Sequence, residues 1–402
     1  MRVRVPGGDW RRVVLRFALA WVVPGTPLIA AAQQPGARAH VASLVETSSD
    51  ASVGATAAAP DAASNGAATE QAADPKPESK SSPWLLVPVV SSNPKLGTSF
   101  GAMGAYLHVF DPASQVSMFG LTYQYTTTHS TVAAAFARAS FHEDHHRIVG
   151  IGVFGYIKNN YDDYLGTGQP LKTNDDLKAV SGRYLYRVKG DWFIGAQGTA
   201  TNYQVLGDSA QDDLALETLG VEGFKSAALG IVGMHDSRDN QDMPTLGWYL
   251  NLNNLAYSEA LGGAATFGAY RVDLRGFWQH GGGHVLAFRQ YNWLTHDAPS
   301  AAQPTVILRG YKFGEYLAPY MSSFEAEERL SFGPRWGATV FAGVASLYGR
   351  DSTASTERSL YPDWGGGIHF VLKPVQRMLV NLEYAAGVEG NRGLYLKFGY
   401  GW

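Results

Sequence analysis

Apolar and polar positions alternate after residue 83 in segments of roughly ten to sixteen residues, separated by Gly, Asp, Asn, Pro and His. The last segment is the clearest. One of its faces carries Trp402, Tyr400, Phe398, Leu396 and Leu394, and the other carries Gly401, Gly399, Lys397, Tyr395 and Gly393. Successive side chains of a strand point to opposite faces, so this pattern predicts a strand between lipid and a wet lumen.

The same alternation recurs along the chain, and no apolar run after residue 83 approaches the length of a membrane helix. It predicts sixteen strands, near residues 84–92, 97–110, 114–128, 130–142, 145–159, 178–188, 191–205, 220–236, 246–260, 266–281, 284–296, 320–332, 336–349, 364–375, 378–389 and 393–402. An even number of strands suits a single-chain barrel, and lipid does not tolerate open sheet edges. We therefore predict an all-β fold, a sixteen-stranded antiparallel transmembrane β-barrel of the outer membrane occupying residues 83–402.

The lengths of the connections predict an orientation. With the N-terminus in the periplasm, the long connections fall outside the cell, at 160–177, 206–219, 297–319 and 350–363. Most of the others are short, such as Asp111-Pro112-Ala113 and the turn at 375–377, and the longer exception is 237–245. Short periplasmic turns and long external loops are the asymmetry expected of such barrels.

The N-terminus has the layout of a secretory signal. Five arginines precede an apolar stretch from about Phe17 to Ile29, which ends in small residues before Gln33. We expect residues 1–32 to be a cleaved signal peptide. Residues 33–82 are rich in Ala, Ser and Pro, with hardly a large apolar side chain, which predicts a disordered periplasmic linker rather than a folded domain.

Composition agrees with a barrel and excludes several other classes. The chain has 46 Gly, 12% aromatic and only 17% charged residues, as expected where aromatic girdles surround an apolar wall. It has no cysteine, which removes disulfides, thiolate chemistry and cysteine-based zinc sites. The formal net charge of −3 offers no basic surplus for nucleic acid.

Two local motifs stand out. Leu308-Arg309-Gly310-Tyr311 lies in the external loop before the twelfth strand, which carries Glu325-Ala326-Glu327-Glu328-Arg329. His235-Asp236-Ser237-Arg238-Asp239-Asn240 and Met243-Pro244-Thr245-Leu246-Gly247-Trp248 form the connection between the eighth and ninth strands. Pro restricts φ and Gly permits a sharp reversal, so the second motif predicts a turn rather than an active site.

These motifs resemble the bacterial surface antigen superfamily, the BamA/TamA-type barrels, over nearly all of residues 84–402. A weaker likeness is Tyr164-Leu165-Gly166-Thr167-Gly168. The resemblance implies that the sixth external loop folds into the lumen, with Arg309, Gly310 and Tyr311 at its tip. It also implies a periplasmic turn carrying Asp236, Arg238, Asp239, Pro244 and Gly247.

The same resemblance implies partners for the loop tip. Glu327 and Arg329 match the family's Glu-x-Arg pair, whereas Gly343 stands where the family tends to carry an Asp that receives the arginine. Because a buried unpaired guanidinium is costly, we expect Glu325 or Glu327 to pair with Arg309. The end of the chain, with Phe398, Tyr400 and Trp402, resembles the signal read by the barrel-assembly machinery.

The expected function is outer-membrane biogenesis or transport of protein or lipid. Well-known family members carry periplasmic receiver domains, which residues 33–82 cannot form, so the route of client handling is open. The alternative is a passive channel or structural barrel without clients. We expect partners in outer-membrane lipid and the assembly machinery, with an unidentified protein or lipid client.

Enzymatic and metal chemistry find little support in the sequence. His142-Glu143-Asp144-His145-His146 contains metal-binding residue types but has no second matched cluster, so a solvated turn is the better interpretation. His280, His284 and Ser258 lack the spacing of a catalytic set. We therefore expect no enzyme activity, no cofactor and no metal.

Overall fold

The structure is a computed structural model of the chain. It describes residues 82–93, 97–161, 171–212, 214, 223–299, 302–311, 316–349, 359–374 and 377–400. The predicted signal peptide and the predicted linker up to residue 81 lie outside the described residues, as does the Tyr164–Gly168 motif.

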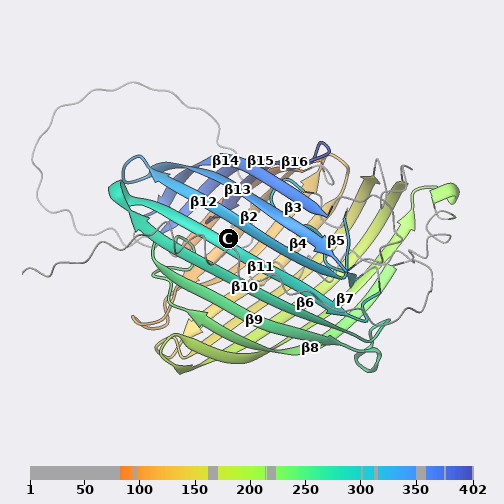
Figure 1. The fold of residues 1–402 in the computed structure, drawn as a ribbon, viewed down its shortest axis with the longest axis horizontal. Coiled ribbons are helices and arrows are strands. Elements are labelled where there is room, and N and C mark those ends of the chain that lie inside the picture. The colour runs from red at the N-terminus through yellow and green to blue at the C-terminus, as the bar shows by residue number, and fades with distance from the viewer. Residues whose placement is uncertain are drawn as a thin grey trace, which may run out of the picture. The chain divides into compact units, whose positions relative to one another are not determined.

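Sixteen antiparallel strands form a closed barrel in which each strand pairs with its neighbours in sequence (Figure 1). The strands are β1 (Trp84–Asn93), β2 (Gly97–His108), β3 (Ser117–Thr126), β4 (Thr131–Phe141), β5 (His146–Tyr161), β6 (Leu171–Lys189), β7 (Trp192–Gly207), β8 (Gly223–Asp236), β9 (Gly247–Tyr257), β10 (Phe267–His280), β11 (His284–His296), β12 (Tyr320–Ser331), β13 (Trp336–Tyr348), β14 (Leu360–Lys373), β15 (Met378–Ala386) and β16 (Arg392–Phe398). Two short 3₁₀ helices, Glu259–Leu261 and Gly281–Gly283, lie in the connections around β10. The predicted fold class is confirmed.

The barrel closes where β1 meets β16. The two strands run antiparallel, with Ser92 opposite Leu394. At seven residues, β16 is the shortest of the sixteen strands as described, so the closing seam is formed by the briefest element of the wall.

The wall has two chemically different faces. On β8 the outward Leu229 and Ile231 are 60% and 69% exposed, whereas the inward Val232, which follows Ile231, is 1% exposed. Exposing side chains of this size to water is unfavourable by about 25 cal/mol per Å² of apolar surface, and hydrocarbon removes that penalty. The outer face is therefore suited to lipid. Among the described residues, no helix is long and apolar enough to cross a bilayer.

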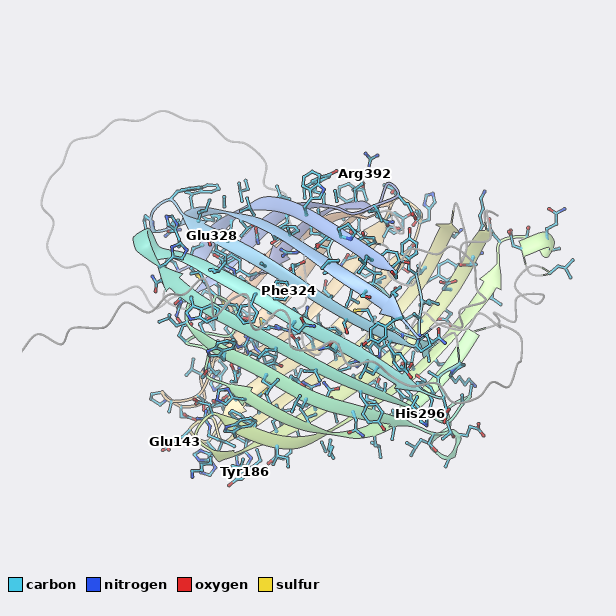
Figure 2. All side chains as sticks on the ribbon, in the orientation of Figure 1. Glu143, Tyr186, His296, Phe324, Glu328 and Arg392 are labelled. Carbon is cyan, nitrogen blue, oxygen red and sulfur yellow. The ribbon has the colours of Figure 1, made fainter. Side chains whose placement is uncertain are left out.

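Aromatic side chains gather near both ends of the outer face. One band contains Trp192, Trp248, Trp278 and Trp336, and the other contains Tyr125, Tyr270, Tyr348 and Trp364, all of them exposed. Figure 2 shows Tyr186 and His296 at opposite ends of the strands, with Phe324 between them. Two aromatic girdles around an apolar band are what a membrane-spanning barrel requires.

Three strand boundaries differ from the predictions by four residues or more. β6 begins at Leu171 and β14 at Leu360, so parts of the predicted loops 160–177 and 350–363 are strand. The start of β6 lacks an apolar face: its inward Thr173 and Asp175 are buried and hydrogen-bonded to each other at 2.7 Å. A polar strand of this kind gives no alternating signal. β16 ends at Phe398, short of the predicted 402.

Leu229→Arg tests the lipid-facing assignment. A cation near the middle of the wall should lower the unfolding free energy by about 2–4 kcal/mol, because it has no partner in hydrocarbon. Leu246→Arg, just before the start of β9, is the matched control and should lower the unfolding free energy by about 1 kcal/mol or less. Urea titration in lipid vesicles measures both, and equal midpoints for the two variants would contradict the assignment.

Candidate functional site

Arg309 lies among strand carboxylates. Although it belongs to the connection between β11 and β12, its side chain is only 8% exposed. Its Nη1 donates to Glu327 at 2.7 Å and approaches Glu383 at 3.1 Å, and its Nε donates to Glu325 at 3.2 Å, with Nη2 bonding the same carboxylate. The guanidinium also stacks over Phe341, 3.3 Å from the ring centroid. The site thus joins one loop cation to carboxylates of β12 and β15.

The two residues after Arg309, Gly310 and Tyr311, also contact the barrel wall. Gly310 has a φ of +93°, and a Cβ there would lie 3.3 Å from the Ala385 backbone, so glycine suits both the conformation and the space. Its N–H donates to Tyr395 Oη at 3.0 Å. Tyr311 Oη donates to the Pro362 carbonyl at 2.6 Å. The Arg-Gly-Tyr motif therefore contacts β14, β15 and β16.

Glu327 connects this site to a second cation. Arg329 Nε donates to Glu327 at 2.6 Å, and Arg329 Nη1 donates to the Pro244 carbonyl at 3.2 Å. The guanidinium of Arg329 also lies 3.7 Å from the ring centroid of Tyr400. The Glu-x-Arg pair thus extends the contacts of Arg309 as far as the connection between β8 and β9.

A fourth carboxylate fills the space beside Gly343. Asp363 on β14 is the cross-strand partner of Gly343, and a Cβ at 343 would lie 2.6 Å from Asp363 Oδ1. Asp363 is 2% exposed, and neither of its carboxylate oxygens receives a hydrogen bond from a described residue. We call Arg309, Glu325, Glu327, Glu383 and Asp363 the Arg309 cluster. Even with Arg329 included, its carboxylates outnumber its guanidinium groups.

The connection between β8 and β9, residues 237–246, is more than the predicted turn, and we call it the strap. Its fold is set locally by Asp239, which accepts hydrogen bonds from the Thr245 amide at 2.8 Å and the Thr245 hydroxyl at 2.7 Å. Gly247 ends it with a φ of +103°, where a Cβ would lie 2.2 Å from the Ser237 carbonyl oxygen. Only glycine fits that position without a shift of the backbone.

On one side the strap and its base are held by β4 and β5. Both Nη atoms of Arg138 donate to Asp242 at 2.8 Å, and Arg147 Nη1 donates to Asp236 at 2.6 Å. Burial opposes the ionisation of Asp242, yet the adjacent Arg138 guanidinium keeps the pKa of this carboxyl below its ordinary value of 3.8. The contact is therefore a charge-assisted, bidentate one.

On the other side the strap reaches the turn between β14 and β15. Arg377 donates to Asp239 at 2.6 Å and to the Met243 carbonyl at 2.9 Å. Met243 also packs against a buried cluster of Val371, Leu379 and Tyr400. Since the strap contacts β4 at one edge and the β14–β15 turn at the other, it lies across this end of the barrel.

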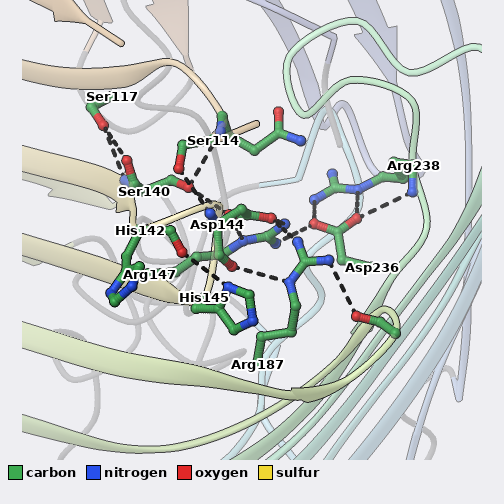
Figure 3. A network of polar contacts seen from close by, with 12 residues as sticks. Ser114, Ser117, Ser140, His142, Asp144, His145, Arg147, Arg187, Asp236 and Arg238 are labelled. Atoms are coloured by element: carbon green, nitrogen blue, oxygen red, sulfur yellow. Dashed lines mark hydrogen bonds and ion pairs between the residues drawn. The ribbon is translucent and has the colours of Figure 1, made fainter. Parts of the chain in front are cut away.

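The turn between β4 and β5 extends the same ion-pair network (Figure 3). Asp144 accepts from Arg147 Nε at 2.8 Å and Nη2 at 2.6 Å, and also pairs with Arg187. His142, Glu143 and Asp144 have φ values of +58°, +56° and +59°, an uncommon conformation for residues with side chains. The described residues contain no group of His, Asp and Glu arranged to hold a metal ion.

One predicted position at the C-terminus is wrong. The alternation placed Tyr400 on the lipid face, but it is buried against Arg329 and His369. Gly399, with a φ of +80°, follows the last residue of β16 and reverses the direction of the next side chain. The side chain of Phe398 and all of Trp402 lie outside the described residues.

Solved structures with a similar fold are outer-membrane barrels. CdiB from Escherichia coli aligns with a TM-score of 0.50 and 10% identity over 79% of this chain and 62% of that chain. BamA from Haemophilus ducreyi lacking POTRA domains 1–3 aligns at 0.49 and 12%, over 79% and 70%. CdiB from Acinetobacter baumannii aligns at 0.48 and 10%, over 79% and 59%. The chain spans less than two thirds of either CdiB chain.

No protein-family model matches the chain, and no curated protein matches its sequence. At 10% identity the likeness to CdiB establishes the fold alone. The fold is that of a CdiB-type barrel.

Asp363→Asn and Glu327→Gln test the charge balance of the Arg309 cluster. Asp363→Asn should leave the temperature of heat-modifiability unchanged or raise it, because it neutralises a surplus carboxylate and adds an amide donor beside Glu325. Glu327→Gln should lower the free energy of unfolding by about 3 kcal/mol, because two buried guanidinium groups lose a charged partner. Equal destabilisation by both substitutions would mean that Asp363 is a required partner of Arg309.

Proposed function

We propose that this protein is an outer-membrane barrel of the bacterial surface antigen kind that works in outer-membrane biogenesis or in transport of protein or lipid. In this proposal it is exported through a cleaved signal peptide and inserted by the barrel-assembly machinery. The loop between β11 and β12 folds inward as a latch, with Arg309 at its tip. The proposal assigns the barrel no catalytic reaction and no cofactor.

The observation that carries this proposal is the set of ion pairs made by Arg309. Its guanidinium bonds Glu325, Glu327 and Glu383, all of them buried. Desolvating so many charges is expensive, and only close pairing offsets the cost. An arrangement of this kind supports a loop held in one defined position inside the lumen.

The strap supports the same interpretation from the end of the barrel. It crosses from Arg138 on β4 to Arg377 in the β14–β15 turn and leaves less room for free passage there. Two segments across one lumen favour handling of a client at the wall over passive diffusion through the centre. The first place to look for a gate is the seam of β1 with β16.

Single-channel recording separates this proposal from a passive channel. The intact protein should show little conductance, because the loop and strap both obstruct the lumen. Deleting residues 303–316 together with Asp239→Ala and Asp242→Ala should produce a large, stable conductance. The control keeps the loop and carries only the two strap substitutions, and should stay mostly closed. A large conductance in the intact protein would favour the passive channel.

Photo-crosslinking in cells tests whether there is a client. Leu86 on β1 and Ile231 on β8 are both exposed, apolar and outward, but only Leu86 lies beside the seam. A photoreactive residue at position 86 should capture protein or lipid adducts that position 231 does not. Identical adducts at both positions would show crosslinking to the ordinary lipid environment alone. The proposed client handling would then be rejected.

A further inference from the structure

A cavity of about 130 Å³ lies inside the barrel next to the strap. The strands β4, β5, β6 and β10 and the strap each contribute one arginine to its lining: Arg138, Arg147, Arg183, Arg275 and Arg238. Apolar side chains, among them Met118, Phe136 and Ile151, complete its wall. The space is sufficient for about four water molecules at about 30 Å³ each, and so for a small polyatomic ion.

The ion pairs around this cavity are unbalanced. Asp144 is shared by Arg147 and Arg187, Asp236 by Arg147 and Arg238, Asp273 by Arg275 and Arg289, and Asp242 pairs with Arg138. Among the described residues, the lining itself holds five arginines and two carboxylates, Asp236 and Asp242. Even when Asp144 and Asp273, which pair with Arg147 and Arg275 from outside the lining, are counted as well, five minus four leaves one positive charge. In a largely buried site such an excess attracts an anion from solution.

One donor on the cavity wall has no hydrogen-bond partner among the described residues. Both Nη atoms of Arg138 are engaged by Asp242, but its Nε is buried without a hydrogen-bond acceptor among the described residues. Arg183 directs Nε and Nη2 to the neutral side chain of Gln197, at 3.1 and 2.6 Å. An oxyanion in the cavity would provide the acceptor that Arg138 Nε lacks among the described residues.

We propose that this cavity binds a small oxyanion of the phosphate class. Guanidinium groups match such ions because their planar, fork-shaped donors reach two oxygens at once. Since Arg238 belongs to the strap and Arg138 holds it through Asp242, the bound anion strengthens the attachment of the strap to β4 and β5. The site goes beyond the proposed function and does not depend on it.

Inorganic phosphate is the direct probe. Added to the purified full-length protein in zwitterionic detergent at constant ionic strength, it should raise the temperature of heat-modifiability more than chloride does. Arg183→Gln should weaken phosphate binding at least about tenfold, the scale of one charge-assisted hydrogen bond. Lys178→Gln is the matched control, because Lys178 lies on the same strand but is exposed. It should bind phosphate like the wild type.

A second variant keeps the proposal testable if Arg183→Gln fails to fold. Arg138→Gln with Asp242→Asn removes an ion pair without changing the net charge, and should also weaken phosphate binding. The proposal is overturned if phosphate acts no differently from chloride, or if both cavity variants respond like the wild type.

Mixed micelles identify the source of the anion. If phosphatidic acid competes with inorganic phosphate and diacylglycerol does not, the cavity takes a lipid headgroup. If neither lipid competes, it takes the soluble ion.

Discussion

A strand that faces hydrocarbon must satisfy all its backbone polar groups within the protein, and the other features of this molecule depend on that constraint. The described strands meet it by closing into one antiparallel ring, with β16 returning to β1. Closure also separates two solvents. Large apolar side chains such as Leu229 and Ile231 stand on the outer face, and polar side chains are directed inward. The charged interior is thus a consequence of the wall, and its energetics depend on how those charges are paired.

The two segments that cross the interior provide much of that pairing. Arg309 supplies a cation to the carboxylates of β12 and β15, while Asp242 of the strap supplies an anion to Arg138. Arg329 joins the two regions, since it bonds Glu327 and also donates to the Pro244 carbonyl. The pairing leaves an excess of carboxylates near Arg309 and an excess of guanidinium groups near β4 and β5. This segregation gives the lumen two regions of opposite charge.

The turn motif between β8 and β9 predicts only a local reversal of the chain, but the strap that it forms also makes long-range contacts. Pro244 and Gly247 do shape a reversal, and Asp239 closes it with hydrogen bonds to Thr245. The same few residues nevertheless contact strands far around the ring. The strap is longer than a hairpin turn needs to be. The extra length serves a structural purpose, because it carries the carboxylates of the strap to arginines on distant strands.

What the sequence could predict depends on how far apart along the chain the interacting residues lie. Alternation with period two reports which face of a strand meets lipid, and it was sufficient to find all sixteen strands and the closed barrel. It failed where no apolar face exists, at the polar start of β6, and at Tyr400, where the positive φ of Gly399 breaks the alternation. Glu325 and Glu327 could be named as candidates for Arg309 because the motifs around them resemble a known pattern and because a buried guanidinium needs a carboxylate partner. Glu383, Asp363 and the bond from Arg138 to Asp242, 104 residues apart, depend on strand order and barrel curvature. Only the tertiary structure could bring those side chains together.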